Sequence, residues 1–230
     1  DYAPVQPVSD DKVRATLGEL SGGVADMVRF QQATGARPGE VCAVRPCDID
    51  RSGDVWVFAP ASHKTEHHQR ERLVFIGPNA QKILGRYLLR PSDSHCFSPR
   101  EADAQVREAR ATARKTPTSC GNRAGTNRKR SPKRPPGVSY TTPSYRRAIH
   151  RACDRACPVP AGLSEDKAKE WTTNHRWSPN QLRHSAATEI RKLYGLEAAQ
   201  VVLGHASAEV TQIYAERDME LGLRVAKEVG

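Results

Sequence analysis

The stretch SPNQLRHSAATEIRKLYG, from Ser178 to Gly195, has the pattern of one well-defined helix. Ser178 is a favoured N-cap residue, and Pro179 occupies the first helical position, where a backbone N–H is not needed. Apolar residues then recur at every fourth position, which is the spacing of one helix face: Leu182, Ala186 and Ile190. Gly195 ends the pattern, and the sequence therefore predicts a capped helix with a buried face.

An arginine and a histidine, Arg183 and His184, follow each other near the start of this predicted helix. Adjacent residues of a helix point about 100° apart, so the two side chains face different surroundings. Two interpretations are open for the arginine. It is either an ordinary surface charge or a ligand for an anion such as a phosphate group.

Upstream of this helix the chain alternates helical and strand-like patterns. Helices are expected within residues 9–34, from Pro38 onward, and over residues 79–90. The runs DVWVFAP (54–60) and ERLVFIG (71–77) are short, β-branched and aromatic, as strands are. They predict an antiparallel hairpin with Lys64 near its tip.

Downstream of the hairpin the predicted structure is helical. Residues 142–156 form a helical pattern with an apolar stripe, and two more helical patterns follow Gly195, in residues 196–204 and 207–230. The fold class is therefore mainly α with a small antiparallel β-sheet, in the α+β class. The apolar fraction of 37% is sufficient for a globular core, and no apolar run approaches the length that spans a membrane.

The six cysteines suggest neither a metal site nor a disulfide framework. No CxxC pair occurs, and no cysteine pair is matched with histidines at zinc spacing. Reduced cysteines in a cytoplasmic protein are the expected outcome. The chain opens with DYAPVQPVSDD, which lacks the basic stub and apolar block of a secretory signal. We expect no metal and no cofactor.

The net charge of +10 comes from one segment. Between Lys115 and Cys153 there are ten basic and no acidic residues, and the rest of the chain holds 26 of each sign. Residues 101–140 are polar and rich in Pro, Gly and Arg, and are expected to form an exposed insert. Such a block is either a solvated loop or a nucleic-acid contact. The candidate DNA-binding residues are Arg128, Lys129, Arg130, Lys133 and Arg134.

Five polar residues occupy places where the fold needs none, and each also has an ordinary explanation. Arg37 starts a helix and can pair with Glu40, one turn on. Lys64 can be solvated charge. The remaining three are Arg183, His205 and Tyr214. Arg183 lies within a predicted helix, His205 follows a glycine, and Tyr214 could be a core tyrosine.

Together these residues resemble the tyrosine recombinases, the phage-integrase type of site-specific recombinase. TGARPGEVCAVRPCDID (34–50) is similar to the first box of that family. NQLRHSAAT (180–188) followed by LGHASAEVTQIY (203–214) is similar to the second box, and HKTEHHQRERLVFI (63–76) to the hairpin that carries the catalytic lysine. Three boxes in the right order make this resemblance specific.

The resemblance implies the chemistry of DNA strand exchange. Tyr214 would attack a phosphodiester and form a 3′-phosphotyrosyl bond, which conserves the bond energy. Arg37 and Arg183 would stabilise the charge on the non-bridging oxygens. Lys64 would protonate the leaving 5′-oxygen, and His205 would donate a further hydrogen bond. Glu40 matches a family acid that braces the arginine site, although a simple first-turn carboxylate explains it equally well.

The sequence departs from the family pattern at Asn180, where the family has a histidine that helps to take the tyrosine proton. Asparagine can orient a phosphate or a water molecule, but it cannot act as a base. His184 points away from that position and is expected to pack or brace the helix. His175 is the candidate substitute for the base. We expect Asn180→His to increase cleavage of a suicide DNA substrate.

The resemblance predicts one catalytic domain over residues 1–230, with the family's N-terminal DNA-binding domain absent from this chain. It implies double-stranded DNA as partner, a homo-oligomer (a tetramer) on DNA, and a bacterial, phage or mobile-element context in the cytoplasm. Three alternatives remain open. One is a nicking-closing enzyme similar to the type IB topoisomerases. Another is a DNA-binding protein derived from a recombinase, with weakened catalysis. The third is a basic protein that binds RNA or DNA only through residues 115–151.

Overall fold

The computed structural model of the chain describes residues 5–61, 72–117, 119–120, 135–204 and 222–230. The described elements are α1 (Asp10–Leu17), α2 (Gly22–Thr34), α3 (Pro38–Ala43), η1 (Pro46–Asp48), β1 (Ile49–Asp50), β2 (Trp56–Phe58), β3 (Val74–Ile76), α4 (Pro78–Gly85), α5 (Pro99–Thr112), α6 (Thr142–Ala156), α7 (Glu165–His175) and α8 (Pro179–Leu203). Residues 222–229 form a further helix. The predicted class, mainly α with a small antiparallel sheet, is confirmed.

The sheet has three antiparallel strands in the order β1–β2–β3. Phe58 of β2 pairs with Ile49 on one side and with Val74 on the other. The predicted hairpin of β2 and β3 is thus confirmed, whereas the short strand β1 was not predicted. The tip of the hairpin, with Lys64, lies outside the described residues.

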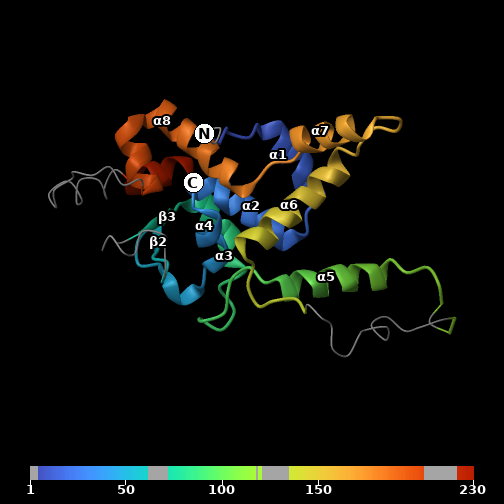
Figure 1. The fold of residues 1–230 in the computed structure, drawn as a ribbon. Helices are drawn as coiled ribbons and strands as arrows, with labels where there is room; N and C mark the ends of the chain where they lie inside the picture. Colours follow the sequence, from blue (N-terminus) through green and yellow to red (C-terminus); the bar gives the residue numbers. More distant parts are fainter. Residues whose placement is uncertain (1–4, 62–71, 118, 121–134, 205–221) are drawn as a thin grey trace.

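Helix α2 is the centre of the fold and packs against α8, α4, α3 and β3 (Figure 1). Its side chains are buried on nearly every side, which explains why it lacks a polar face. The main core gathers around it, and a smaller core joins both pieces of α8 to the C-terminal helix through Ile190, Leu203 and Val225. The predicted stripes of α6 and of α8 before Gly195 are buried as expected.

Two predicted helices differ in detail. The pattern over residues 79–90 becomes α4, which ends at Gly85, although Tyr87 and Leu88 still pack on the core. At Gly195 the backbone has φ 87° and ψ 179°, so α8 breaks there and resumes in a new direction. Only glycine adopts such a conformation readily. The predicted stop is therefore a kink between two helical pieces.

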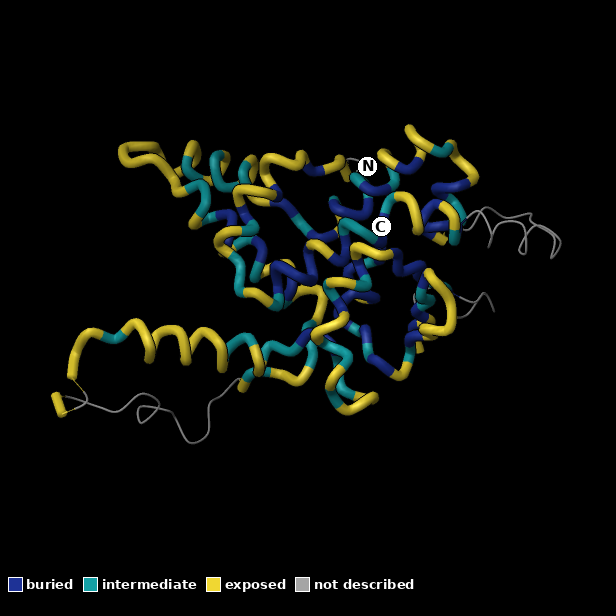
Figure 2. The backbone as a smooth tube through the Cα atoms, turned by 180° about the vertical axis from the view of Figure 1, so that it is seen from behind, coloured by how far each residue is buried: buried dark blue, intermediate teal, exposed yellow. Residues whose placement is uncertain are grey.

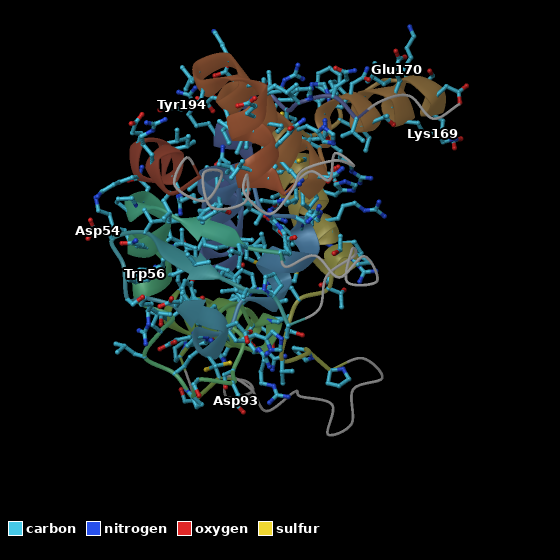
Figure 3. The ribbon with its side chains drawn as sticks, turned by 90° about the vertical axis from the view of Figure 1, so that its left-hand side faces the viewer. Asp54, Trp56, Asp93, Lys169, Glu170 and Tyr194 are labelled. Carbon is cyan, nitrogen blue, oxygen red and sulfur yellow. The ribbon has the colours of Figure 1, made fainter. Side chains whose placement is uncertain are left out.

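The C-terminal helix lies against the sheet and α8 of the same chain. Lys227 Nζ contacts Asp54 Oδ2 at 2.8 Å, and Tyr194 Oη donates to Glu228 at 2.8 Å. Figure 3 shows Asp54 and Tyr194 on either side of this helix, which is coloured red. In the described part of the chain no helix is both long and apolar enough to cross a membrane.

Candidate active site

The turn between α2 and α3 places the first candidate residue. Gly35 has φ +63°, the left-handed conformation that glycine adopts without a steric penalty. A Cβ atom at Gly35 would meet Leu203 Cδ2 at 2.5 Å, so the end of α8 approaches this turn closely. Two residues later Arg37 becomes the N-cap of α3, ahead of Pro38. Glycine here serves both the turn and the contact.

A buried glutamine fixes the start of α8 to this turn. Gln31 Nε2 donates to the carbonyl oxygens of Ala36 and Pro179, both at 3.0 Å, and its Oε1 accepts from Tyr145 Oη at 3.1 Å. The side chain is fully buried, so each of these bonds replaces one to water. This bonding role of Gln31 was not predicted from the sequence.

Arg183 lies on the buried side of α8 and connects both ends of that helix to the turn. Its Nη1 donates to Gly35 O at 2.9 Å, and its Nη2 donates to Leu203 O at 2.5 Å. The residue is only 6% exposed. The alternative of an ordinary surface charge is therefore excluded by the structure.

Arg37 reaches the same end of α8 from the other side. Its Nη2 donates to Gly204 O at 3.3 Å, and its Nη1 donates to Glu40 Oε1 at 2.8 Å. Arg37 and Arg183 thus contact consecutive carbonyl groups, those of Gly204 and Leu203. Arg37 forms the expected ion pair with Glu40 and also lies near Arg183. A helix-start ion pair and a place in the candidate site are therefore compatible for Arg37.

A third arginine, Arg72, joins this group and was missed by the sequence analysis. It precedes β3, is 5% exposed, and donates from Nε and Nη2 to the two oxygens of Glu40 at 2.9 and 3.1 Å. Its Nη1 donates to Leu73 O at 2.6 Å and to Val202 O at 3.4 Å. The available signal was a charged residue immediately before an apolar strand. We call Arg37, Arg72, Arg183 and Glu40 the arginine cradle.

The cradle changes the protonation behaviour of two of its members. Burial alone would raise the pKa of Glu40, but hydrogen bonds and charge from Arg72, with hydrogen bonds from Arg37, lower it to about 2. Burial, followed by the charges of Arg37 and Arg72, lowers the pKa of Arg183 to about 9. The cradle therefore holds three cations and one carboxylate at neutral pH, a net charge that suits a phosphate group.

The residues around Asn180 lie beside this cradle on α8. Asn180 is exposed, and its Nδ2 lies 3.4 Å from His184 Nε2, one turn further along the helix. His184 is half-buried. His175 stacks on Trp171, with ring centroids 4.0 Å apart, and its Nδ1 lies 2.7 Å from Trp171 O. These contacts keep His175 within α7.

The other predicted site residues lie outside the described part of the chain: Lys64, His205, Tyr214 and the basic residues Arg128, Lys129, Arg130, Lys133 and Arg134. Two of them are close in sequence to described residues. His205 directly follows Gly204, and Lys64 belongs to the connection between β2 and β3. Within the described ranges, no group of three or more His, Cys, Asp or Glu residues could hold a metal ion.

Comparison with known proteins gives a family match in the C-terminal half. The model of the phage integrase family matches residues 140–220, a range that begins before α6 and includes α7 and α8. No match was found among curated protein sequences.

Several solved structures are similar to the chain. One is the Tn1549 transposon integrase in complex with circular intermediate DNA, with 16% identity and a TM-score of 0.53 over 96% of this chain and 68% of that one. Another is the XerH site-specific recombinase bound to its difH substrate in a pre-cleavage complex, with 14% identity and a TM-score of 0.47 over 96% and 55%. XerA recombinase shows 19% identity and a TM-score of 0.46 over 97% and 66%.

The chain thus spans between about half and two thirds of the length of these solved chains. At such identities the likeness to the integrase shows the fold. The match over residues 140–220 and this fold confirm the resemblance first seen in the sequence boxes. The chain has the fold of a tyrosine recombinase catalytic domain and carries the phage integrase family signature in residues 140–220.

Proposed function

We propose that this chain cleaves and rejoins DNA strands in site-specific recombination, through a covalent 3′-phosphotyrosyl intermediate on Tyr214. One observation carries the proposal. Arg37 and Arg183, from the two ends of the sequence, donate to consecutive carbonyl groups directly before His205. Two guanidinium groups placed in this way match the paired oxygens of one phosphodiester.

The cradle supplies electrostatic stabilisation in the proposed reaction. Tyr214 Oη attacks the phosphorus atom and releases its proton to solvent water, the bond to the 5′-oxygen breaks, and negative charge gathers on the non-bridging oxygens. Arg37 and Arg183 donate hydrogen bonds to those oxygens. Their positions are fixed before the substrate arrives by bonds to Glu40 and to the carbonyls around Gly35 and Leu203, so little reorganisation is needed.

Three further residues complete the proposed chemistry. Lys64 protonates the departing 5′-oxygen, and His205 donates a hydrogen bond to the phosphate. Asn180 orients the phosphate or a water molecule, since an amide cannot take the tyrosine proton. Its exposed position next to His184 supports a role at the DNA-facing surface.

The proposed partner is double-stranded DNA, and the proposed active form is a homo-tetramer on DNA in a bacterial or mobile-element setting. The Tn1549 integrase structure is a complex with DNA, which supports this partner. The basic residues Arg128, Lys129, Arg130, Lys133 and Arg134 would contribute phosphate contacts. The net charge of +10 favours association with a polyanion.

Covalent capture of DNA tests the proposal. The protein is incubated with a pool of end-labelled, nicked duplexes of randomised sequence, and adducts that survive denaturing detergent are separated on a gel. The wild-type protein should form adducts, and Tyr214→Phe should form none while binding DNA with unchanged affinity. DNA binding without any wild-type adduct would instead identify a recombinase-derived DNA-binding module.

The role of Lys64 has its own test in the same assay. A substrate whose bridging 5′-oxygen is replaced by sulfur has a leaving group that needs no proton, because a thiolate is far less basic than an alkoxide. Lys64→Met should cleave the normal substrate slowly and the sulfur substrate at nearly the wild-type rate. Equal loss on both substrates would exclude Lys64 as the general acid.

A further inference from the structure

Arg72 is a buried charge that the proposed reaction does not use directly. A buried arginine needs a partner and several acceptors, and this residue has both in Glu40 and two backbone carbonyls. Replacing a buried ion pair by apolar residues is often neutral or stabilising, so stability alone does not explain its presence. The contacts that it makes are those of the cradle.

The carboxylate of Glu40 receives four hydrogen bonds, two from each of two arginines. Oε1 accepts from Arg37 Nη1 at 2.8 Å and from Arg72 Nε at 2.9 Å. Oε2 accepts from the Arg37 backbone N at 2.8 Å and from Arg72 Nη2 at 3.1 Å. Arg72 makes a bidentate contact with the carboxylate, whereas the side chain of Arg37 donates a single hydrogen bond to it.

We propose that Arg72 is a positioning residue for Arg37: by holding both oxygens of Glu40, it prevents that carboxylate from clasping the Arg37 guanidinium. This inference rests on the proposed function, because it assigns Arg37 to the scissile phosphate. With Arg72 present, Arg37 Nη2 contacts Gly204 O and its remaining donors are available to an incoming anion. Without Arg72, a buried carboxylate would compete with the phosphate for the same N–H groups.

The balance of charge supports the same conclusion. Arg37, Arg183 and Glu40 by themselves carry a net charge of one, and Arg72 raises it to two. The transition state gathers negative charge on the phosphate. A net positive charge of two stabilises it more than a charge of one, because the site is buried and weakly screened. Arg72 supplies this charge without touching DNA, because it is covered by the end of α8.

The position of Arg72 also links the three segments that carry the proposed catalytic residues. It precedes β3, at the end of the connection that contains Lys64, and it binds Glu40 of α3 and Val202 O of α8. Gly204 lies directly against it, since a Cβ atom there would meet Arg72 Nη1 at 2.6 Å. A single side chain thus contacts Glu40 of α3, the residue before β3 and the end of α8.

The first experiment compares Arg72→Met and Arg72→Lys with the wild type. Arg90→Met is the matched control, because Arg90 forms a similar paired contact with Glu101 and bonds to two carbonyls, away from the cradle. DNA affinity and its salt dependence should stay within about twofold for all variants, since none of these arginines is assigned to DNA. Single-turnover adduct formation should fall on the order of 100-fold in Arg72→Met, through misplacement of Arg37.

A second readout separates positioning from general support of the fold. Adding Glu40→Gln to Arg72→Met removes the competing carboxylate, so the double variant should regain on the order of tenfold in rate. Glu40 faces Arg37 on α3, Arg72 before β3 and Arg183 on α8, and loss of Arg72 raises the pKa of Glu40 because burial is then less opposed. The difference in the rate of adduct formation between the wild type and Arg72→Met should therefore become smaller as the pH falls.

The outcomes distinguish the two proposals. If the wild type and Arg72→Met form adducts at the same rate, the positioning role is wrong. It is also wrong if the loss of rate in Arg72→Met is the same at every pH and the double variant is no faster than Arg72→Met. If the wild type forms no adduct, the proposed function fails. The titration of Glu40 followed by carbon-13 NMR in the free protein then decides the electrostatic role, and an unchanged pKa in Arg72→Lys and Arg72→Met would overturn it.

Discussion

The arginine cradle and helix α5 are both rich in charged residues, and their arginines have opposite surroundings. Arg72 and Arg183 in the cradle are buried and have fixed partners. Helix α5 has no buried residue, and Figure 2 shows it extending from the body of the molecule as a mostly exposed helix. One of its arginines, Arg107, pairs with Asp103 along the helix surface at 2.8 Å.

The comparison teaches that burial, more than residue type, decides what an arginine contributes. An exposed ion pair is screened by water and salt and contributes little to stability. A buried guanidinium in a weakly screened site interacts strongly with every neighbouring charge. Removing one partner of a buried ion pair is strongly destabilising, because the other charge is left buried and unpaired. The following changes therefore have effects that decrease from the cradle to α5.

The largest effect is expected for Arg183→Met in the cradle. Removing one preorganised donor from a site of developing charge lowers the rate by on the order of 100- to 1000-fold. Single-turnover adduct formation measures this loss. Arg110→Met on α5 removes the same charge from an exposed helix and should leave the cleavage rate unchanged. Equal rates for the two variants would contradict the role of the cradle.

The acid sensitivity of the fold should depend on Glu40. Its pKa is lowered from 4.5 to about 2 in the folded protein, so its stabilising contribution is present above pH 4.5 and is lost as the pH falls through 2. The difference corresponds to about 3 kcal/mol of unfolding free energy.

Urea unfolding at pH 6 and pH 2 measures this contribution. The wild type should lose about 3 kcal/mol more than Glu40→Gln over that interval. Glu101→Gln, which alters a half-exposed carboxylate on α5, should lose as much as the wild type. The expectation fails if Glu40→Gln and the wild type show the same pH dependence.

A smaller effect is expected for Gly35→Ala, beside the cradle. The left-handed backbone costs alanine about 1 kcal/mol, and the collision of its Cβ with Leu203 adds at least a similar amount. Gly162→Ala is the control, because Gly162 also has a positive φ, of +85°, but has no atom near the added Cβ. Denaturant unfolding should show a larger loss of unfolding free energy for Gly35→Ala than for Gly162→Ala. Equal losses would mean that Leu203 moves away from the added Cβ at no cost in stability.

The smallest effect is expected on α5 itself. Arg107→Ala breaks the exposed pair with Asp103, one turn away on the same helix. Such pairs contribute roughly 0.3–0.5 kcal/mol, so the melting temperature should hardly change. A loss of several degrees would show that α5 has a partner in the folded protein, and the simple contrast between the two regions would then be wrong.

Much of the fold could be predicted from local patterns. The capped start of α8 at Ser178 and Pro179, the turn at Gly35 and the β2–β3 hairpin all have signals that act within a few residues. The strand β1 was missed because two residues, Ile49 and Asp50, are too few to show an alternation.

The site was predicted in part, and the missed residues share a cause. Arg37, Glu40 and Arg183 could be selected because they occur in motifs with a recognisable order. Gln31 and Arg72 could not, because each owes its role to partners that are distant in sequence, such as Pro179 for Gln31 and Val202 for Arg72. A glutamine on a helix and an arginine before a strand are ordinary in themselves.

The sequence by itself determined most of the helices, the β2–β3 hairpin, the caps and turns, the excess of basic charge in residues 115–153, and the family resemblance. These depend on local backbone preferences and on composition, which need no long-range contact. The tertiary structure alone decided that Arg183 is buried, that Arg72 shares Glu40 with Arg37, and that the end of α8 receives both Arg37 and Arg183. The physical reason is that burial and charge pairing arise only when distant segments pack together and exclude water from between them.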